Sequence, residues 1–311
     1  MDIGLIILNF MAIALMRVVQ KVSAKKVSKT VKGKIFFHYG GYYNLLSALF
    51  SLITLCIVGF DGFTLPTVLC AFATAICLAL ELFASIEGLK RTTLVVNQMF
   101  SVGALIIPCI VGIFFFNEPM TIWQWLGIGA FAVAMYFMVS GSNKAEERKA
   151  EKMSLTTIGL LLLTLCAGGG TMVAQKAFGK LVPNGNVAAY SFLMFALNSL
   201  ILYVGYFISL LTKKKRKEPE QVELKEKENF MLPKALMICG LVLAFAVFII
   251  NILVTELGKS VDSAILFSVS YAISIIITIL VGAIFYKEKI TIRNIIGIVL
   301  CVGALALINF L

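Results

Sequence analysis

Two ionisable side chains lie within long apolar stretches of the sequence. Arg17 ends the run "ILNFMAIALMR", and Glu81 lies in "ICLALELFAS". A charge at the centre of a membrane helix costs about 2.5–3.5 kcal/mol on insertion scales, so such residues are usually functional. Glu81 is a candidate proton-coupling carboxylate or cation ligand, and Arg17 is a candidate partner of Glu81 or anchor for a solute carboxylate. The sequence leaves an alternative open, in which Arg17 extends to the membrane surface and Glu81 is its structural counter-ion.

Amide and hydroxyl side chains form a second set of candidates within the apolar stretches. They are Asn9, Asn44, Asn97, Gln98, Asn198, Asn251, Ser270 and Tyr271. Asn251 lies near the position in the second half of the chain that corresponds to Glu81 in the first half. Each member either contacts a solute or forms a hydrogen bond between helices, which stabilises the packing by about 0.6–2 kcal/mol.

The elements that must position these residues are membrane-spanning helices. The chain has 311 residues, of which 60% are hydrophobic and 14% charged, and its mean hydropathy is +0.98. An apolar run of about 20 residues is what a helix needs to cross a bilayer, and only helices satisfy their own backbone there. We predict an all-α polytopic membrane protein with ten transmembrane helices. Their ranges are 2–20, 35–60, 66–86, 92–116, 121–140, 155–177, 187–211, 233–255, 262–286 and 290–311.

The loops between these predicted helices alternate in charge. Lysines and arginines concentrate after the first, third, fifth, seventh and ninth helices, whereas the other loops hold few charges. Basic loops stay in the cytoplasm, so both termini are expected outside the cell. The net charge of +11 is explained by these loops, and we therefore expect no nucleic-acid partner.

One segment of the sequence occurs twice. "FNEPMTIWQWLG" (Phe116–Gly127) matches "YKEKITIRNIIG" (Tyr286–Gly297), and "VVQKVSAK" (Val18–Lys25) matches "VAQKAFGK" (Val173–Lys180). The chain therefore divides into a first five-helix repeat over 1–140, a cytoplasmic linker over 141–154 and a second repeat over 155–311. An odd number of helices per repeat turns the second copy upside down in the membrane, as in many secondary transporters.

The residues shared by the two copies are those that shape a helix start. Thr121 and Thr291 are expected to cap the following helices, with Gln124 or Asn294 as reciprocal partners. Glu118 and Glu288 place negative charge near the positive helix ends, and Gly127 and Gly297 permit close helix contact. Because an inverted repeat puts the two glutamates on opposite membrane faces, we interpret this motif as structural.

Glycine and proline mark possible points of movement. "AGGGTM" contains Gly168, Gly169 and Gly170, and it predicts either a hinge or break in its helix or close packing against a neighbour. Pro108 should kink the fourth helix.

At the level of these two halves, the chain resembles the drug/metabolite transporter superfamily, specifically its ten-helix EamA-type members. The doubled glutamate turn followed by T-x-x-x-x-x-G carries the resemblance, which covers essentially the whole chain. It implies a bundle around a central cavity that moves small solutes by alternating access. It also implies that the first, third and fourth helices of each half line the cavity, which suits Glu81, Asn97, Gln98, Asn251, Ser270 and Tyr271. Many ten-helix members have their termini inside, whereas the lysines here place them outside.

Several kinds of chemistry have no signature in this sequence. It contains no phosphate-binding loop, no H-E-x-x-H motif and no His/Cys cluster, and its cysteines form no C-x-x-C pair. We therefore expect no catalytic residue, no metal site and no cofactor.

The expected function is secondary active transport of a small polar metabolite across the cell membrane, taken to be a bacterial cytoplasmic membrane. Arg17 suits an acid and Glu81 an amine, so together they suit an amino acid. The expected partners are the solute, membrane lipids and a proton or another coupling ion, and the oligomeric state is left open. The alternatives are a non-transporting membrane protein (an enzyme, sensor or partner subunit) and, among transporters, a lipid-linked sugar flippase.

Overall fold

The structure, a computed structural model, is helical throughout the residues it describes. These are 8–9, 11–16, 18–19, 22–23, 34–60, 62–89, 100–101, 103–118, 120–140, 155–215, 232–259, 261 and 292–310. Within them lie helices α2 (Lys34–Val58), α3 (Leu65–Leu89), α5 (Ile106–Phe115), α6 (Ile122–Ser140), α8 (Leu155–Leu181), α9 (Val187–Lys215), α10 (Lys234–Leu257) and α12 (Ile292–Phe310).

Five of these helices are long and apolar enough to cross a membrane. They are the spans Phe37–Val58, Leu65–Ser85, Leu155–Leu181, Val187–Ser209 and Lys234–Leu257, and Ile106–Phe115 and Ile122–Ala134 are shorter apolar helices. Seven predicted ranges (35–60, 66–86, 121–140, 155–177, 187–211, 233–255 and 290–311) coincide with described helices whose ends differ by up to four residues, and the range 92–116 contains the shorter α5. The ranges 2–20 and 262–286 lie wholly or partly outside the described residues and stay predictions. The number of spans in the whole chain stays a prediction.

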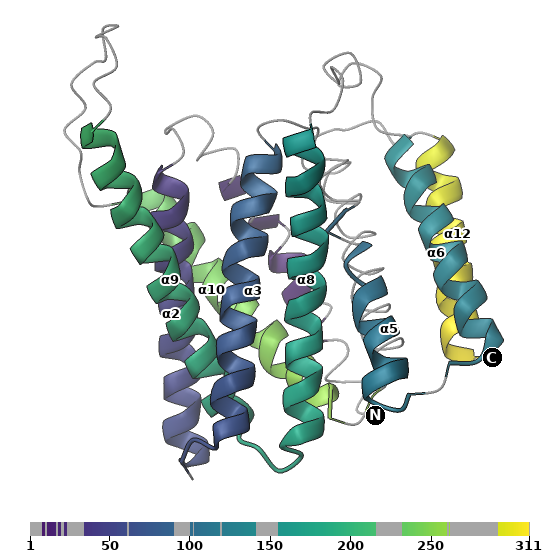
Figure 1. The fold of residues 1–311 in the computed structure, drawn as a ribbon, viewed down its shortest axis with the longest axis horizontal. Coiled ribbons are helices and arrows are strands. Elements are labelled where there is room, and N and C mark those ends of the chain that lie inside the picture. The colour runs from purple at the N-terminus through teal and green to yellow at the C-terminus, as the bar shows by residue number, and fades with distance from the viewer. Residues whose placement is uncertain are drawn as a thin grey trace, which may run out of the picture.

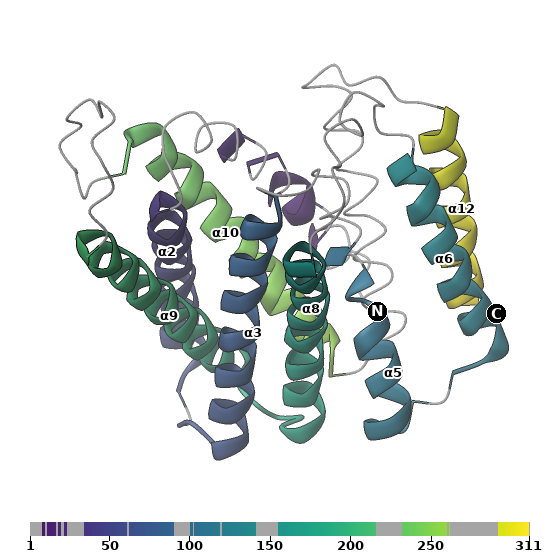
Figure 2. The same ribbon diagram turned by 45° about the horizontal axis from the view of Figure 1, so that its top comes forward.

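The helices stand side by side, and the pairs α2–α3, α5–α6 and α8–α9, which short connections join, each run in opposite directions (Figure 1). The described residues of the connections 59–64, 116–121 and 182–186, and the described residues 258–259 and 261 beyond α10, lie at one end of the bundle. We call this end the short-loop face. Helices α6 and α12 form a pair at one edge of the molecule in both views (Figure 2), and α12 ends where α6 begins. These two helices therefore run antiparallel.

The helix contacts follow a pattern that is nearly unchanged when the two halves are exchanged. Helix α2 packs along α9, the second helix of each predicted half, and α6 packs along α12, the fifth helix of each. Helix α3 contacts α9, and α10 contacts α2, so the third helix of each half meets the second helix of the other.

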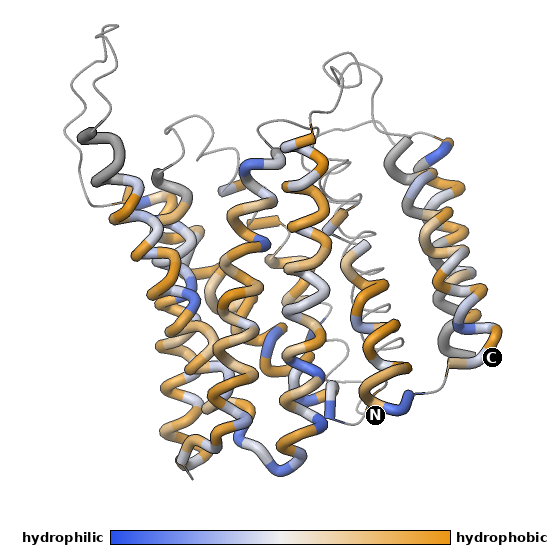
Figure 3. Tube along the Cα trace, in the orientation of Figure 1, coloured by the Kyte–Doolittle hydropathy of each residue, from blue (hydrophilic) through white to orange (hydrophobic). Residues whose placement is uncertain are grey.

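Apolar side chains cover the outer surface of the bundle as well as its interior. The Cα trace coloured by hydropathy is mostly apolar along every described helix (Figure 3). Ile57, Phe115 and Ile292 are each more than three-quarters exposed, at 80%, 78% and 77%. A surface of this kind suits lipid, because a monomeric soluble protein rarely exposes contiguous apolar area of this extent.

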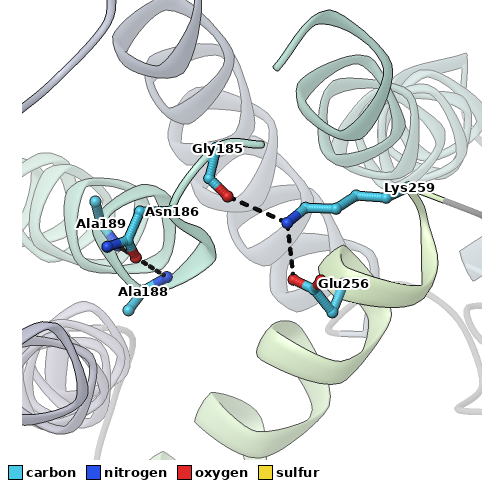
Figure 4. A network of polar contacts seen from close by, with 6 residues as sticks. All are labelled: Gly185, Asn186, Ala188, Ala189, Glu256 and Lys259. Carbon is cyan, nitrogen blue, oxygen red and sulfur yellow. Dashed lines mark hydrogen bonds and ion pairs between the residues drawn. The ribbon is translucent and has the colours of Figure 1, made fainter. Parts of the chain in front are cut away.

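Polar contacts tie the turns of the short-loop face together (Figure 4). Lys259 Nζ lies 2.9 Å from Glu256 Oε2 and donates to the Gly185 carbonyl at 3.1 Å. Asn186 Oδ1 accepts from the Ala188 and Ala189 N–H groups and so caps α9, while Asn186 Nδ2 donates to the Gly59 carbonyl. The turn after α2, the turn before α9 and the end of α10 are thus joined.

The fourth predicted helix contains an irregular turn one turn before its proline. Residues 103 and 106–115 are helical, and Ala104 and Leu105 form a turn between them. Pro108 has no N–H to donate to the Ala104 carbonyl, and that carbonyl instead accepts from Ile107 N–H at 3.1 Å. The backbone is therefore irregular just before Pro108, and the kink of this helix stays a prediction.

Candidate functional site

Glu81 lies on α3 and is half-buried where this helix packs against α8. Its Oε1 atom lies 3.5 Å from Ser101 Oγ, the outer limit of hydrogen-bond distance. The Tyr43 hydroxyl of α2 and the Cys77 thiol, one turn earlier on α3, are close enough to interact electrostatically with the carboxylate. Residues from three segments thus surround this carboxylate inside the bundle.

The three consecutive glycines of α8 lie beside Glu81 and the irregular turn of the fourth helix. A Cβ atom at Gly168 would lie 3.1 Å from Ala104 Cβ and 3.4 Å from Glu81 Oε1. At Gly169 it would lie 2.6 Å from Ile107 Cβ and 2.9 Å from the Ala104 carbonyl oxygen. Helix α8 is continuous through this stretch, so the sequence produces close packing here and no break. The glycines thus pack against Ala104 and Ile107, in the segment just before Pro108.

Two amides connect α8 to α10 farther along the same helix. Gln175 Nε2 donates to Asn251 Oδ1 at 2.7 Å, and Asn251 Nδ2 donates to the Val247 carbonyl at 2.9 Å. Gln175 is buried and Asn251 is half-buried. The sequence identified Asn251 as a candidate but not Gln175, its partner.

A buried ion pair lies at the end of α8 on the short-loop face. Lys176 Nζ is 2.8 Å from Glu118 Oε1, and these residues are only 1% and 8% exposed. Lys180 Nζ, on a 38% exposed residue, is 3.3 Å from the same oxygen. Lys176 also donates to the Val261 carbonyl, just beyond the end of α10. Charged groups from α8 and from the α5–α6 turn thus meet here, and two of the three residues are buried.

The sequence did not predict this cluster, because the predicted sixth helix ends too early. The predicted range 155–177 puts Lys176 at the helix end, whereas α8 continues to Leu181 and holds Lys176 inside the protein. The interpretation of Glu118 as a charge that only marks a helix start is incomplete, because this carboxylate is also paired with another helix. The repeated "QK" of "VVQKVSAK" and "VAQKAFGK" was the available signal.

Polar contacts thus follow each other along α8, and we call this series the polar column. Gly168 lies beside the Glu81 carboxylate, Gln175 donates to Asn251, and Lys176 pairs with Glu118. The column begins at the Glu81 carboxylate and ends at the Lys176 cluster about 12 Å away, at 1.5 Å per residue.

The helix-start motif has the geometry that the sequence predicts. Gln124 N–H donates to Thr121 Oγ1 at 3.3 Å, and Thr121 N–H donates to Gln124 Oε1 at 3.0 Å, so the reciprocal cap is confirmed. Gly127 and Gly297 are both buried on the paired helices α6 and α12.

Asn44 and Asn198, which did not suit a cavity-lining role, contact each other. Asn198 Nδ2 donates to Asn44 Oδ1 at 3.1 Å between α9 and α2, and both residues are buried. Asn44 Nδ2 donates to the Gly40 carbonyl in its own helix. Interhelical bonding is therefore the observed role of this amide pair.

Other predicted residues lie outside the described part of the chain. These are Arg17, Asn97, Gln98, Ser270, Tyr271, Glu288 and Thr291. A pairing of Arg17 with Glu81 stays a prediction for this reason. Within the described residues, no group of three or more His, Cys, Asp or Glu side chains is placed to hold a metal ion.

The apolar helices and the polar column between them define a multi-pass membrane protein. A profile of the EamA-like transporter family matches residues 155–310, the whole second half of the chain. The chain therefore belongs to the EamA-like transporter family, within the drug/metabolite transporter superfamily.

A solved structure supports the fold over the first half as well. Described only as "Crystal structure of protein", it superposes with a TM-score of 0.72 at 11% identity and covers 97% of this chain and 95% of that one. At this identity the similarity shows a shared fold alone. No curated protein matched the chain.

Proposed function

We propose that this protein is a secondary active transporter that moves a small polar metabolite, such as an amino acid, by alternating access. The family is one of transporters rather than enzymes. The observation that carries the proposal is the half-buried Glu81 carboxylate, held between α3 and α8 at one end of the polar column. An ionisable group inside a membrane bundle is costly and is retained for ion or solute binding.

The transport mechanism we propose uses two inverted five-helix repeats, 1–140 and 155–311, around a central cavity. The near symmetry of the helix contacts between the two halves supports it, because α2 packs along α9 and α6 along α12, and each pair joins equivalent helices. The antiparallel course of α6 and α12 also supports an inverted relation (Figure 1). In this scheme each half rocks against the other and exposes the same polar column to alternate faces.

Glu81 is proposed to couple the movement to a proton. In this scheme the carboxylate takes up a proton in one state of the transport cycle and releases it in another, when water or a cationic solute group reaches it. The neighbouring Gln175–Asn251 amide pair supplies donors and acceptors for the polar groups of the solute. An amino acid matches this combination of a carboxylate and amides, and Arg17 adds a cation for its carboxylate.

The membrane we propose is a bacterial cytoplasmic membrane, with the short-loop face outside. The described basic residues of the opposite end include Lys213, Lys214 and Lys215 at the end of α9. A cytoplasmic position of these residues follows the positive-inside rule.

The test is transport by the full chain alone in proteoliposomes with an imposed pH gradient. A mixture of radiolabelled amino acids is the first probe, and it should enter or leave faster than in protein-free vesicles. Glu81→Gln should remove the dependence of the rate on the pH gradient, while the exposed control Glu256→Gln should keep it. Gradient-driven flux that is unchanged in Glu81→Gln would exclude Glu81 from coupling. Absence of any solute flux across a wider metabolite panel would favour a non-transporting membrane protein.

A further inference from the structure

The Glu118–Lys176–Lys180 cluster joins segments that the proposed mechanism must move apart. Glu118 belongs to the α5–α6 turn of the first repeat, and both lysines belong to α8 of the second repeat. Lys176 additionally holds the Val261 carbonyl beyond α10. The cluster thus connects three segments at the short-loop face.

The turn that carries Glu118 has a fixed shape. Asn117 adopts a left-handed backbone with φ of 51°, a conformation that asparagine tolerates better than most residues. The N–H groups of Phe116 and Glu118 both donate to the Gly112 carbonyl, at 3.2 and 3.1 Å. The Thr121–Gln124 cap then starts α6. Glu118 is therefore held in position by its own turn before it meets the lysines.

Burial makes this ion pair sensitive to water. Two charges removed from water are stable only while they remain paired, and an unpaired charge at the same place is strongly unfavourable. If the face opens, water solvates each partner separately and the charges are again stable. States with a dry but broken pair are disfavoured, so the cluster favours two discrete arrangements, closed and open.

We propose that the Glu118–Lys176–Lys180 cluster is an ion-pair lock that holds the short-loop face closed, and that solute passes this face only when the lock separates. The inference rests on the proposed alternating-access function and extends it to named residues. Asn186 and Lys259 hold neighbouring turns together, and the lock attaches the α5–α6 turn to the same face.

The protein contains a native reporter for this opening. Cys109 lies on α5, is 4% exposed and lies within electrostatic range of Glu118. In a background with the other six cysteines replaced by alanine, its reaction with a charged methanethiosulfonate reagent measures how often this region becomes wet. The protein is held in nanodiscs, so that the reagent reaches both faces and the result does not depend on orientation or on a known solute.

Loss of either buried partner should open the face. Glu118→Gln leaves the buried Lys176 without its carboxylate, and Lys176→Gln removes the nearer of the two cations next to the buried Glu118. Each variant should react at least about tenfold faster than the background, because loss of a buried ion-pair partner shifts a two-state equilibrium strongly. The exchanged pair Glu118→Lys/Lys176→Glu should return the rate toward the background. Glu256→Gln breaks an exposed ion pair on the same face and should change the rate by less than about twofold.

Reaction rates of Glu118→Gln and Lys176→Gln within about twofold of the background would overturn the lock, because loss of a buried ion-pair partner should shift the equilibrium more than that. If either variant fails to fold, as judged by size-exclusion chromatography, Lys180→Gln decides. It takes one of two cations away from the buried Glu118 carboxylate, so a smaller acceleration of the Cys109 reaction is expected, still above the twofold limit set by the Glu256→Gln control. Fast Cys109 reaction in the variants together with no solute flux in the wild type would support the lock and reject the transport proposal.

Discussion

At the scale of single residues, three pairs of polar side chains inside this bundle form hydrogen bonds or ion pairs between different segments. The Asn44–Asn198, Gln175–Asn251 and Lys176–Glu118 contacts each bridge two segments far apart in the sequence. Lipid offers no hydrogen-bond partner, so a polar side chain in a membrane helix must be satisfied by the protein or by enclosed water. These pairs therefore determine which helices pack together.

Asn44 and Asn198 provide the most direct measurement of such a contact. Asn44→Leu and Asn198→Leu should each lower the unfolding free energy, and the double variant should lose less than the sum of the two. The coupling between them should be about 0.6–2 kcal/mol, the range found for interhelical bonds in membranes. Unfolding in mixed micelles of denaturing and native detergent measures these free energies.

Thr54 supplies a matched control for this double-mutant cycle of Asn44 and Asn198. Its Oγ1 donates to the Phe50 carbonyl within α2 itself, so Thr54→Val removes a polar group without breaking a contact between helices. This variant should show no coupling to Asn198→Leu. Additive losses for Asn44 and Asn198 would mean that their hydrogen bond does not contribute to stability.

At the scale of elements, the glycines of α8 set the distance to its neighbours. Gly170 lies where a Cβ atom would be 2.8 Å from Cys77 Sγ of α3, and Gly169 lies against Ile107 of α5. These contacts bring α8 close enough for Glu81 to lie beside Gly168. The irregular turn before Pro108 includes Ala104, which packs against Gly168 and Gly169. A change in the shape of this turn would therefore move residues that lie next to Glu81.

Gly169→Ala should therefore destabilise the protein, whereas Gly159→Ala on the same helix should not. The added methyl at position 169 would lie 2.6 Å from Ile107 Cβ, and α5 must shift. Overpacking of this kind costs about 1–3 kcal/mol. No atom lies within 4 Å of a Cβ at Gly159, so that substitution is a control for helix propensity alone. Thermal unfolding in detergent would check this, and equal melting temperatures of the two variants would contradict it.

The same elements show how far the sequence could predict the structure. Apolar length located α2, α3, α8, α9 and α10, because each run must cross the membrane. The Thr121–Gln124 cap was predictable because capping is local in sequence. The Lys176–Glu118 pair was not, because its partners are 58 positions apart and meet only through helix packing. Polarity alone also could not show that Asn44 pairs with Asn198 while Asn251 pairs with Gln175.

At the scale of the whole molecule, the contacts are nearly symmetric between the halves but the chemistry is not. The α2–α9 and α6–α12 pairs join equivalent helices. Glu81 on α3 corresponds in the repeat to the region of Asn251 on α10, where an amide replaces the carboxylate. In the mechanism that we propose, this difference assigns the coupling to the half that carries Glu81.

Orientation is the last property of the whole molecule that the charges predict. The linker 141–154 and the segment after α9 are rich in lysine and arginine, so both should stay in the cytoplasm and both termini should lie outside. Alkaline phosphatase fused after Leu311 should be active in cells. Green fluorescent protein fused at the same position should not fluoresce. Fusions after Lys149 in the linker should behave in the opposite way.

The opposite outcome at both positions would place the termini inside, as in many ten-helix members of the superfamily, and would turn the short-loop face toward the cytoplasm. The lock at Glu118 would then close the inner face instead of the outer one. Its chemistry would be unchanged, because the burial of Lys176 and Glu118 does not depend on which compartment lies beyond them. The fusions therefore decide the direction in which the lock opens, and the Cys109 measurement decides whether it is a lock.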